Sequence, residues 1–201
     1  MRSENLDVVC NGAACFASVA LGGISGSSSG PVASKLGSER QLLEELNKVS
    51  ASQVGEISVW VQSIIVSSAK KAGLNVVSGS REPFVAFPSP QDLLGLGKPN
   101  SAAATLHVQL WNVGFGRSAG TGFRPAVMAR VYLVSRRDAR IAWANAFALG
   151  PAPGGRVIQI GETTPVVDAF GDLLSQNKPL LDGLRVATDR LMQTVAKEIS
   201  P

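Results

Sequence analysis

Three stretches of the chain repeat apolar positions every three to four residues, which is the spacing of one face of a helix. The first opens at Ser38, where Ser38 and Gln41 fit a capping box. The second opens near Ser50 and ends in Lys70, Lys71 and Gly73, which suit the dipole and the glycine cap of a helix C-terminus. The third opens at 177–179, with a proline near its first turn, and runs to about residue 199. We predict three helices with these apolar stripes: Leu42, Leu43, Leu46, Val49; Ile57, Trp60, Val61, Ile64, Ile65; and Leu181, Leu184, Leu191, Val195.

Other stretches alternate apolar and polar positions, as strands do. A strand begins at Thr105 and places His107 and Gln109 opposite an apolar row. Strands over 126–134 and 140–149 are joined by a short polar loop, which predicts an antiparallel pair. Shorter strands are expected at 74–78 and 157–160, and a short helix within 164–175. The stretch 57–66 also allows a strand, because it is rich in valine and isoleucine, but its flanking caps favour the helix.

Residues 140–149 read RIAWANAFAL and put small and large side chains on opposite faces. We expect a helix to lie close against the alanine face. The large face would then fill a thicker layer or an interface between protomers, which makes Trp143 and Phe147 candidate interface residues. The alternative is that alanine serves only as small filler. The two rows are Ala142, Ala144, Ala146, Ala148 and Ile141, Trp143, Asn145, Phe147, Leu149.

The order of these elements predicts an α+β fold. Helices and strands separate along the chain, which favours a mostly antiparallel sheet of about four to five strands packed with two or three helices in a two-layer sandwich. Residues 38–201 form a single domain in this interpretation. Residues 1–37 form a Gly/Ser-rich apolar arm or linker, in which 22–30 are nearly all glycine and serine.

Composition agrees with a globular protein that needs no metal or disulfide to fold. The chain has 201 residues, of which 45% are hydrophobic and 17% charged, and a domain of this size buries about 70% of its unfolded surface. No run of about 18 apolar residues predicts a transmembrane helix. The net charge of +4 is spread along the chain and does not by itself indicate nucleic-acid binding.

Basic residues nevertheless gather in the loops and ends of the predicted strand hairpin. They could contact RNA, anionic lipid or an acidic partner. The alternative is a solubilising rim on an antiparallel sheet. These candidate residues are Arg117, Arg124, Arg136, Arg137 and Arg140.

Catalytic groupings are absent or weak in the sequence. His107 is the only histidine, and it falls in the middle of a strand. The chain has neither the G-x-S-x-G pattern of serine hydrolases nor a phosphate-binding glycine motif, and its carboxylates are scattered. We expect no enzyme activity, no cofactor and no metal site. An enzyme of unfamiliar type would need a pocket that gathers His107 with carboxylates or with Arg117.

The cysteines, Cys10 and Cys15, leave three alternatives open. They are free or buried thiols, a local disulfide, or metal ligands, for which only His107 could add a nitrogen. The run 12–15 is similar to a lipoprotein cleavage box, but Gly12 stands where a leucine-like residue is expected, and the start MRSENLD lacks a signal-peptide pattern. Either the protein is cytoplasmic or its targeting segment lies outside this chain.

The segments AGLNVV at 72–77, TLHVQL at 105–110 and 129–150, followed by a long terminal helix, carry a resemblance. Over about 55–199 the chain resembles small bacterial envelope lipoproteins of unassigned function. More distantly, it is similar to the α/β domain shared by the curli-secretion lipoprotein and the amino-terminal part of the Tol-system propeller protein. The resemblance implies a non-enzymatic binding or assembly protein, periplasmic or associated with the outer membrane through an N-terminal anchor. It also implies a Cys10–Cys15 disulfide and a partner that is an envelope protein or a second copy; nucleic acid is not expected.

Overall fold

The computed structural model describes residues 6–11, 20–21, 32–82, 88–95, 102–117, 121–150, 157–169 and 171–199. The helices are α1 Val32–Val54, α2 Ile57–Lys71, α3 Pro90–Gly95, α4 Asp172–Ser175 and α5 Asn177–Glu198. The strands are β1 Leu6–Asn11, β2 Ala20–Leu21, β3 Val76–Glu82, β4 Ala104–Arg117, β5 Arg124–Ser135, β6 Arg140–Leu149 and β7 Ile158–Gly161.

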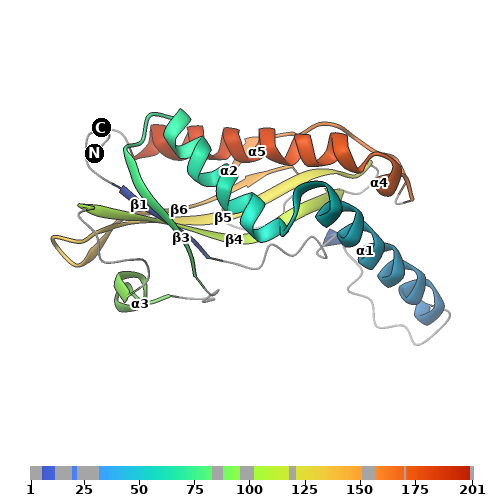
Figure 1. Cartoon of the computed structure of the whole chain (residues 1–201), viewed down its shortest axis with the longest axis horizontal. Coiled ribbons are helices and arrows are strands. Elements are labelled where there is room, and N and C mark those ends of the chain that lie inside the picture. The colour runs from blue at the N-terminus through green and yellow to red at the C-terminus, as the bar shows by residue number, and fades with distance from the viewer. Residues whose placement is uncertain are drawn as a thin grey trace.

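The elements form an α+β sandwich, as the sequence predicts. Helices α2 and α5 cover one face of a sheet, and the short helix α3 lies against the other face (Figure 1). The strand order is β3-β1-β4-β5-β6-β7, with β2 beside β4. The expected antiparallel pairs form its centre, β4 with β5 and β5 with β6. The sheet has seven strands in place of four to five, and the added pairs are parallel.

Strand β1 comes from the stretch predicted to be an arm. It lies between β3 and β4, and its described side chains are buried on both faces of the sheet, with Val8 and Val9 at 0% exposure. Parallel strands buried on both faces read as continuous apolar runs without alternation, which is why the search for alternation missed β1. Helix α1 also begins before residue 38, while the Gly/Ser-rich run 22–30 lies outside the described residues.

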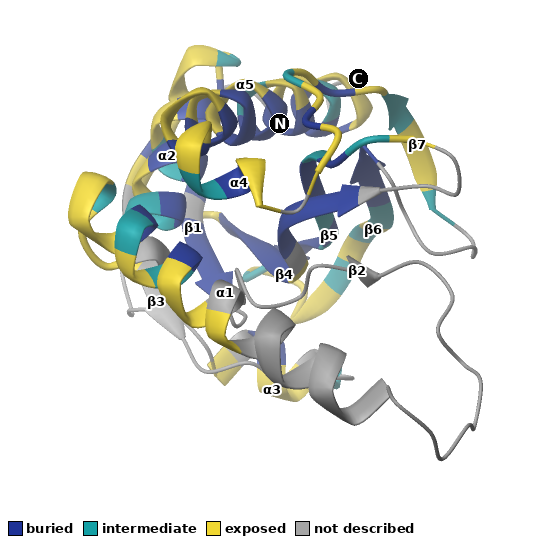
Figure 2. Cartoon of the chain, turned by 90° about the vertical axis from the view of Figure 1, so that its right-hand side faces the viewer, coloured by how far each residue is buried: buried dark blue, intermediate teal, exposed yellow. Residues whose placement is uncertain are grey.

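The ends of α1 and α2 lie next to glycines, and the serine expected to begin α2 lies inside α1. The predicted break at Ser50 is wrong, because Ser50 lies inside α1 and the break comes at Gly55, which takes a φ of +75°. Helix α2 ends where expected, at Gly73 with a φ of +86°, a conformation that glycine adopts without strain. The alternative of a strand over 57–66 is wrong. Helix α5 spans the predicted final helix, and Figure 2 shows its buried positions facing the sheet.

Strand β6 reverses the expected roles of its two faces. From Trp143 onward the large row faces α2 and α5: Phe147 is fully buried, and the Trp143 ring lies 6.0 Å from the Phe147 ring. Ile141 lies beyond the register shift at Leu133/Val134 and packs on the other face, against Leu93 of α3. The alanine row faces away from α2 and α5, on the side of the sheet where the short helix α3 lies (Figure 1). Ala144 pairs with Tyr132 and Ala146 with Arg130. Large side chains of β5 therefore occupy the space beside the alanines, and Phe147 is a core residue in this structure.

Candidate binding surface

The five candidate arginines do not form one surface. Arg136, Arg137 and Arg140 lie at the β5–β6 hairpin, whereas Arg124 begins β5 and Arg117 ends β4 at the other end of the sheet. Eleven residue steps along β5 separate the two ends, or about 36 Å at 3.3 Å per residue. The Arg117 side chain lies outside the described positions. Arg124 therefore lies far from the three hairpin arginines, and an anionic-partner role for these residues stays a prediction.

At the hairpin, local contacts engage two of the three arginines. Arg136 donates from Nε to Thr105 Oγ1 at 2.9 Å, and Arg140 Nε lies 3.8 Å from an Asp138 carboxylate oxygen. Arg137 is exposed. A small pocket of about 200 Å³ is lined here by Leu133, Arg137, Asp138 and Arg140, among others. With Asp138 beside the two arginines the pocket keeps a balance of one positive charge, but its volume lies below about 300 Å³, the lower end of the range for small-molecule sites.

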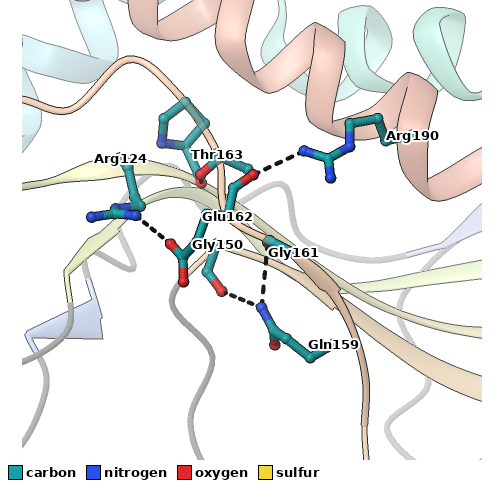
Figure 3. A network of polar contacts seen from close by, with 8 residues as sticks. Arg124, Gly150, Gln159, Gly161, Glu162, Thr163 and Arg190 are labelled. Atoms are coloured by element: carbon teal, nitrogen blue, oxygen red, sulfur yellow. Dashed lines mark hydrogen bonds and ion pairs between the residues drawn. The ribbon is translucent and has the colours of Figure 1, made fainter.

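At the other end, Arg124 is engaged by the segment 161–167, called the strap below. Its guanidinium pairs with the Glu162 carboxylate, and only 16% of the Arg124 side chain is exposed (Figure 3). Arg190 of α5 donates to the Glu162 carbonyl at 2.8 Å, and the Thr163 hydroxyl donates to the Pro125 carbonyl. These contacts fasten the strap between β5 and α5. Arg124 therefore has a structural role and is poorly placed to bind an outside anion.

The residues with catalytic potential are buried. His107 has 0% exposure in β4, between Val9 of β1 and Tyr132 of β5. Cys10 is a free, buried cysteine, and desolvation raises the pKa of its thiol to about 12. Cys15 lies outside the described residues, so the disulfide stays a prediction. The described residues contain no group of three or more histidine, cysteine or acidic side chains placed to hold a metal ion.

The face of the sheet that turns away from α2 and α5 carries an aromatic site that sequence reasoning missed. Trp111 of β4 is 37% exposed, and the Arg130 guanidinium carbon lies 4.6 Å from the centre of its ring. The indole nitrogen of Trp111 donates to Gln109 Oε1 at 3.0 Å, which fixes the ring. Ala146, paired with Arg130, and Ala144 lie in the neighbouring strand. We call Trp111, Arg130, Ala144 and Ala146 the Trp111 patch.

Helix α3 covers the adjoining part of the same face. Leu93 is fully buried against Tyr132 and Val134, so the hairpin end of this face is closed, whereas Trp111 and Ala144 remain exposed. The signal for the patch was present in the sequence, since Trp111 continues the row of His107 and Gln109. The pairing register that brings Arg130 beside it could not be read from spacing alone.

The Trp111 patch has the features of a protein-binding hot spot. Tryptophan and arginine are the residues most enriched at such sites, and a fixed indole loses little conformational freedom on binding. An arginine held over the ring face adds an electrostatic attraction of about 0.5–1 kcal/mol at exposed sites. The flanking alanines leave room for a partner's backbone to approach the sheet closely.

Comparison with known proteins identifies no family. No family model and no curated protein matches the chain. Among solved structures, a PelC dodecamer from Paraburkholderia phytofirmans is 12% identical, covers 97% of this chain and 86% of that chain, and gives a TM-score of 0.39. Protein XCC0632 from Xanthomonas campestris is 8% identical, with 70% and 63% coverage and a TM-score of 0.41. The LpoB C-terminal domain from Escherichia coli is 17% identical, with 74% and 83% coverage and a TM-score of 0.24. At these identities and TM-scores the likenesses carry no argument about function.

None of the described helices combines the length and the apolar character that a membrane-spanning helix needs.

Proposed function

We propose that this protein is a non-enzymatic binding or assembly protein of the bacterial cell envelope, and that the Trp111 patch is its contact surface for a protein partner. The observation that carries the binding role is the stack of Arg130 on the half-exposed Trp111, on a sheet face that the main helix layer does not cover. The partner is an envelope protein or a second copy of this chain.

The environment of two reactive side chains supports a binding role over a catalytic one. The single imidazole of the chain, His107, is buried within the sheet, and general acid–base catalysis needs a group within hydrogen-bond reach of substrate. The raised pKa of Cys10 disfavours the thiolate, which is the nucleophilic form of cysteine.

The envelope location rests on the sequence resemblance over 55–199. It is tested on protein purified from its native host, by cell fractionation and by the intact mass of the unreduced protein with and without denaturing alkylation. We expect periplasmic or outer-membrane fractions and a processed N-terminus. A cytoplasmic protein with an unprocessed chain and two alkylatable thiols would contradict this location.

The contact surface is tested by a photo-crosslinking amino acid at Ala144, with Val186 as the control position. Val186 lies on α5 in the other layer and is 58% exposed, and Ala144 is exposed too, so chance collisions can reach both positions. In the native host we expect a defined adduct from position 144 and none from 186. The mass of the adduct tells whether the partner is a second copy or another protein.

A Trp111→Ala change should weaken that adduct at least about 10-fold, because truncating a hot-spot residue costs about 2 kcal/mol or more. The melting temperature of the variant checks that it remains folded. Equal adducts from positions 144 and 186, or an adduct that survives Trp111→Ala in a folded variant, would contradict the proposal.

A further inference from the structure

A groove opens in the helix layer, on the opposite side of the sheet from the Trp111 patch. It lies where α1 passes into α2 and faces the first half of α5, and its volume is about 400 Å³. Small-molecule sites in proteins range from about 300 to 1,000 Å³ and combine an apolar lining with a few polar groups. The groove meets this description, and neither the hairpin pocket nor the strap does.

The floor of the groove is apolar. It is lined by Val54 at the end of α1, Trp60 in the first turn of α2 and Leu181 of α5. Leu181 is 3% exposed, while Val54 and Trp60 are half-buried and pack against the main core. The indole of Trp60 therefore presents an aromatic surface that is held by the fold and still reachable from solvent.

The rim of the groove carries an excess of positive charge. Lys178 and Arg185 lie seven residues apart on one side of α5, which places them about 10 Å apart along the helix axis. Both are exposed, and the ion pairs recorded among the described residues involve neither of them. Asp182 lies between them, at helical spacing from each. Counting the three side chains together leaves a balance of one positive charge at the rim.

Buried contacts hold the walls of the groove in place before any ligand arrives. Asn177, the first residue of α5, donates from Nδ2 to the Ser50 hydroxyl of α1 at 2.8 Å, and both residues are buried. Gly55, with its positive φ, sets the turn between α1 and α2. A preformed site avoids the cost of ordering side chains and loops on binding.

We propose that this groove binds a molecule with an apolar, preferably aromatic, body and a single negative charge. The body lies against Trp60 and Leu181, and the anionic head pairs with Lys178 or Arg185 on the rim, since Asp182 occupies the position between them. Packing of the ligand's aromatic surface against the Trp60 indole supplies most of the affinity. The one excess positive charge at the rim favours the anion over a neutral molecule of the same shape. The shared chemistry, an apolar body with one carboxylate, is found in a free aromatic acid and in a free fatty acid.

The first experiment compares two probes of nearly the same shape. One is 1-anilinonaphthalene-8-sulfonate, an aromatic monoanion, and the other is N-phenyl-1-naphthylamine, which lacks the sulfonate. Both are titrated into the full chain and followed by probe fluorescence. In a variant with Lys178→Gln and Arg185→Gln we expect the affinity for the anion to fall at least about 10-fold. The affinity for the neutral probe should change less than about twofold, because the floor of the groove is unchanged.

A matched control removes the same amount of charge elsewhere. Lys70 of α2 and Arg137 of the hairpin are exposed and lie outside the groove, and changing both to glutamine should leave anion binding within about twofold of wild type. A Trp60→Phe variant keeps an aromatic floor and should retain binding of the probe, whereas Trp60→Ala should weaken the binding of both probes.

Competition distinguishes the two sources of ligand. Displacement of the probe by indole-3-acetate supports a free aromatic acid, and displacement by decanoate supports a free fatty acid. The proposal is overturned if the wild-type protein does not bind the anionic probe, if the groove variant and the control variant lose affinity equally, or if neither competitor displaces the probe. Because the Trp111 patch lies on the other face, its crosslinking result is independent of all these outcomes.

Discussion

Gly183 lies in the first half of α5, at the point where this helix passes closest to the strap and to the start of β5. A β-carbon at this position would press against the carbonyl oxygen of Thr164. It would also lie 2.6 Å from Pro125 Cγ and 3.0 Å from Pro165 Cδ. Carbon atoms in favourable contact lie about 3.5–4.0 Å apart. A Gly183→Ala change therefore forces either α5 or the strap to move.

Two effects of this change oppose each other. Within a helix, alanine is favoured over glycine by about 1 kcal/mol. Overpacking a tight contact costs about 1–3 kcal/mol, and we expect the upper end here because backbone and two proline rings cannot turn aside as a flexible side chain would. The difference is a net loss of about 2 kcal/mol. For a chain of this length that corresponds to a fall of about 4–8 °C in melting temperature.

The assay is thermal unfolding followed by circular dichroism, with Gly171→Ala as the matched control. Gly171 precedes α4 with a φ of −63°, and a β-carbon there would meet nothing within 4 Å. The control should melt at or slightly above the wild-type temperature. If Gly183→Ala instead stabilises the protein, as an ordinary helical glycine would, then the close approach of α5 to the strap is not a feature of the folded protein.

Three further predictions concern the core and the termini of elements. The Cys10 thiol should resist alkylation at pH 8 until the protein is denatured. Because its pKa is raised from 9.0 to about 12, its contribution to stability is present below pH 9 and is lost as the pH rises toward 12, which urea unfolding at several pH values will measure. Hydrogen bonds from the Ser89 side chain and from the Ser89 backbone N–H, the latter at 2.8 Å, lower the pKa of the Asp92 carboxyl. The Asp92→Asn change should therefore lower the melting temperature slightly at neutral pH, with the difference vanishing as the pH falls through the lowered pKa. Phe147→Ala should cost about 3–5 kcal/mol in the free energy of unfolding, while Ala144→Ser should cost little; an unchanged unfolding curve for Phe147→Ala would restore this residue as an interface candidate.

The sequence predicts those parts of the fold that depend on neighbours along the chain. Helices α2 and α5 follow from apolar stripes bounded by Lys70, Gly73 and Pro179, and the β5–β6 pair follows from alternation on both sides of a short loop. Strand β1 escapes this reasoning, because its partners β3 and β4 lie more than 60 residues away in sequence and its parallel pairing leaves no local mark. A search for apolar runs without alternation would have found it.

The candidate sites were harder to predict because they depend on register and on which face is covered. Arginines that are near one another in sequence lie at opposite ends of β5, because a strand rises about 3.3 Å per residue. The size of Trp143 makes it an interface candidate, and in this structure it is half-buried against the core, so its place in an interface stays a prediction. The Trp111 patch needs residues from three strands. The helix groove needs the turn at Gly55 between α1 and α2, which brings Trp60 opposite α5. Neither arrangement follows from local spacing.

The position of β1 has a consequence for how the chain can be processed. The run Gly12–Cys15, similar to a lipoprotein cleavage box, follows β1 directly. A peptidase that cut before Cys15 would remove Leu6–Asn11, the strand that joins β3 to β4 in the middle of the sheet. The mature protein would lose an inner strand of the sheet. The edge of β4 at Val108, which pairs with Cys10, would then be exposed. In a protein with this fold, proteolytic maturation must end upstream of Leu6, and Cys15 cannot be the lipid-bearing residue at a new N-terminus.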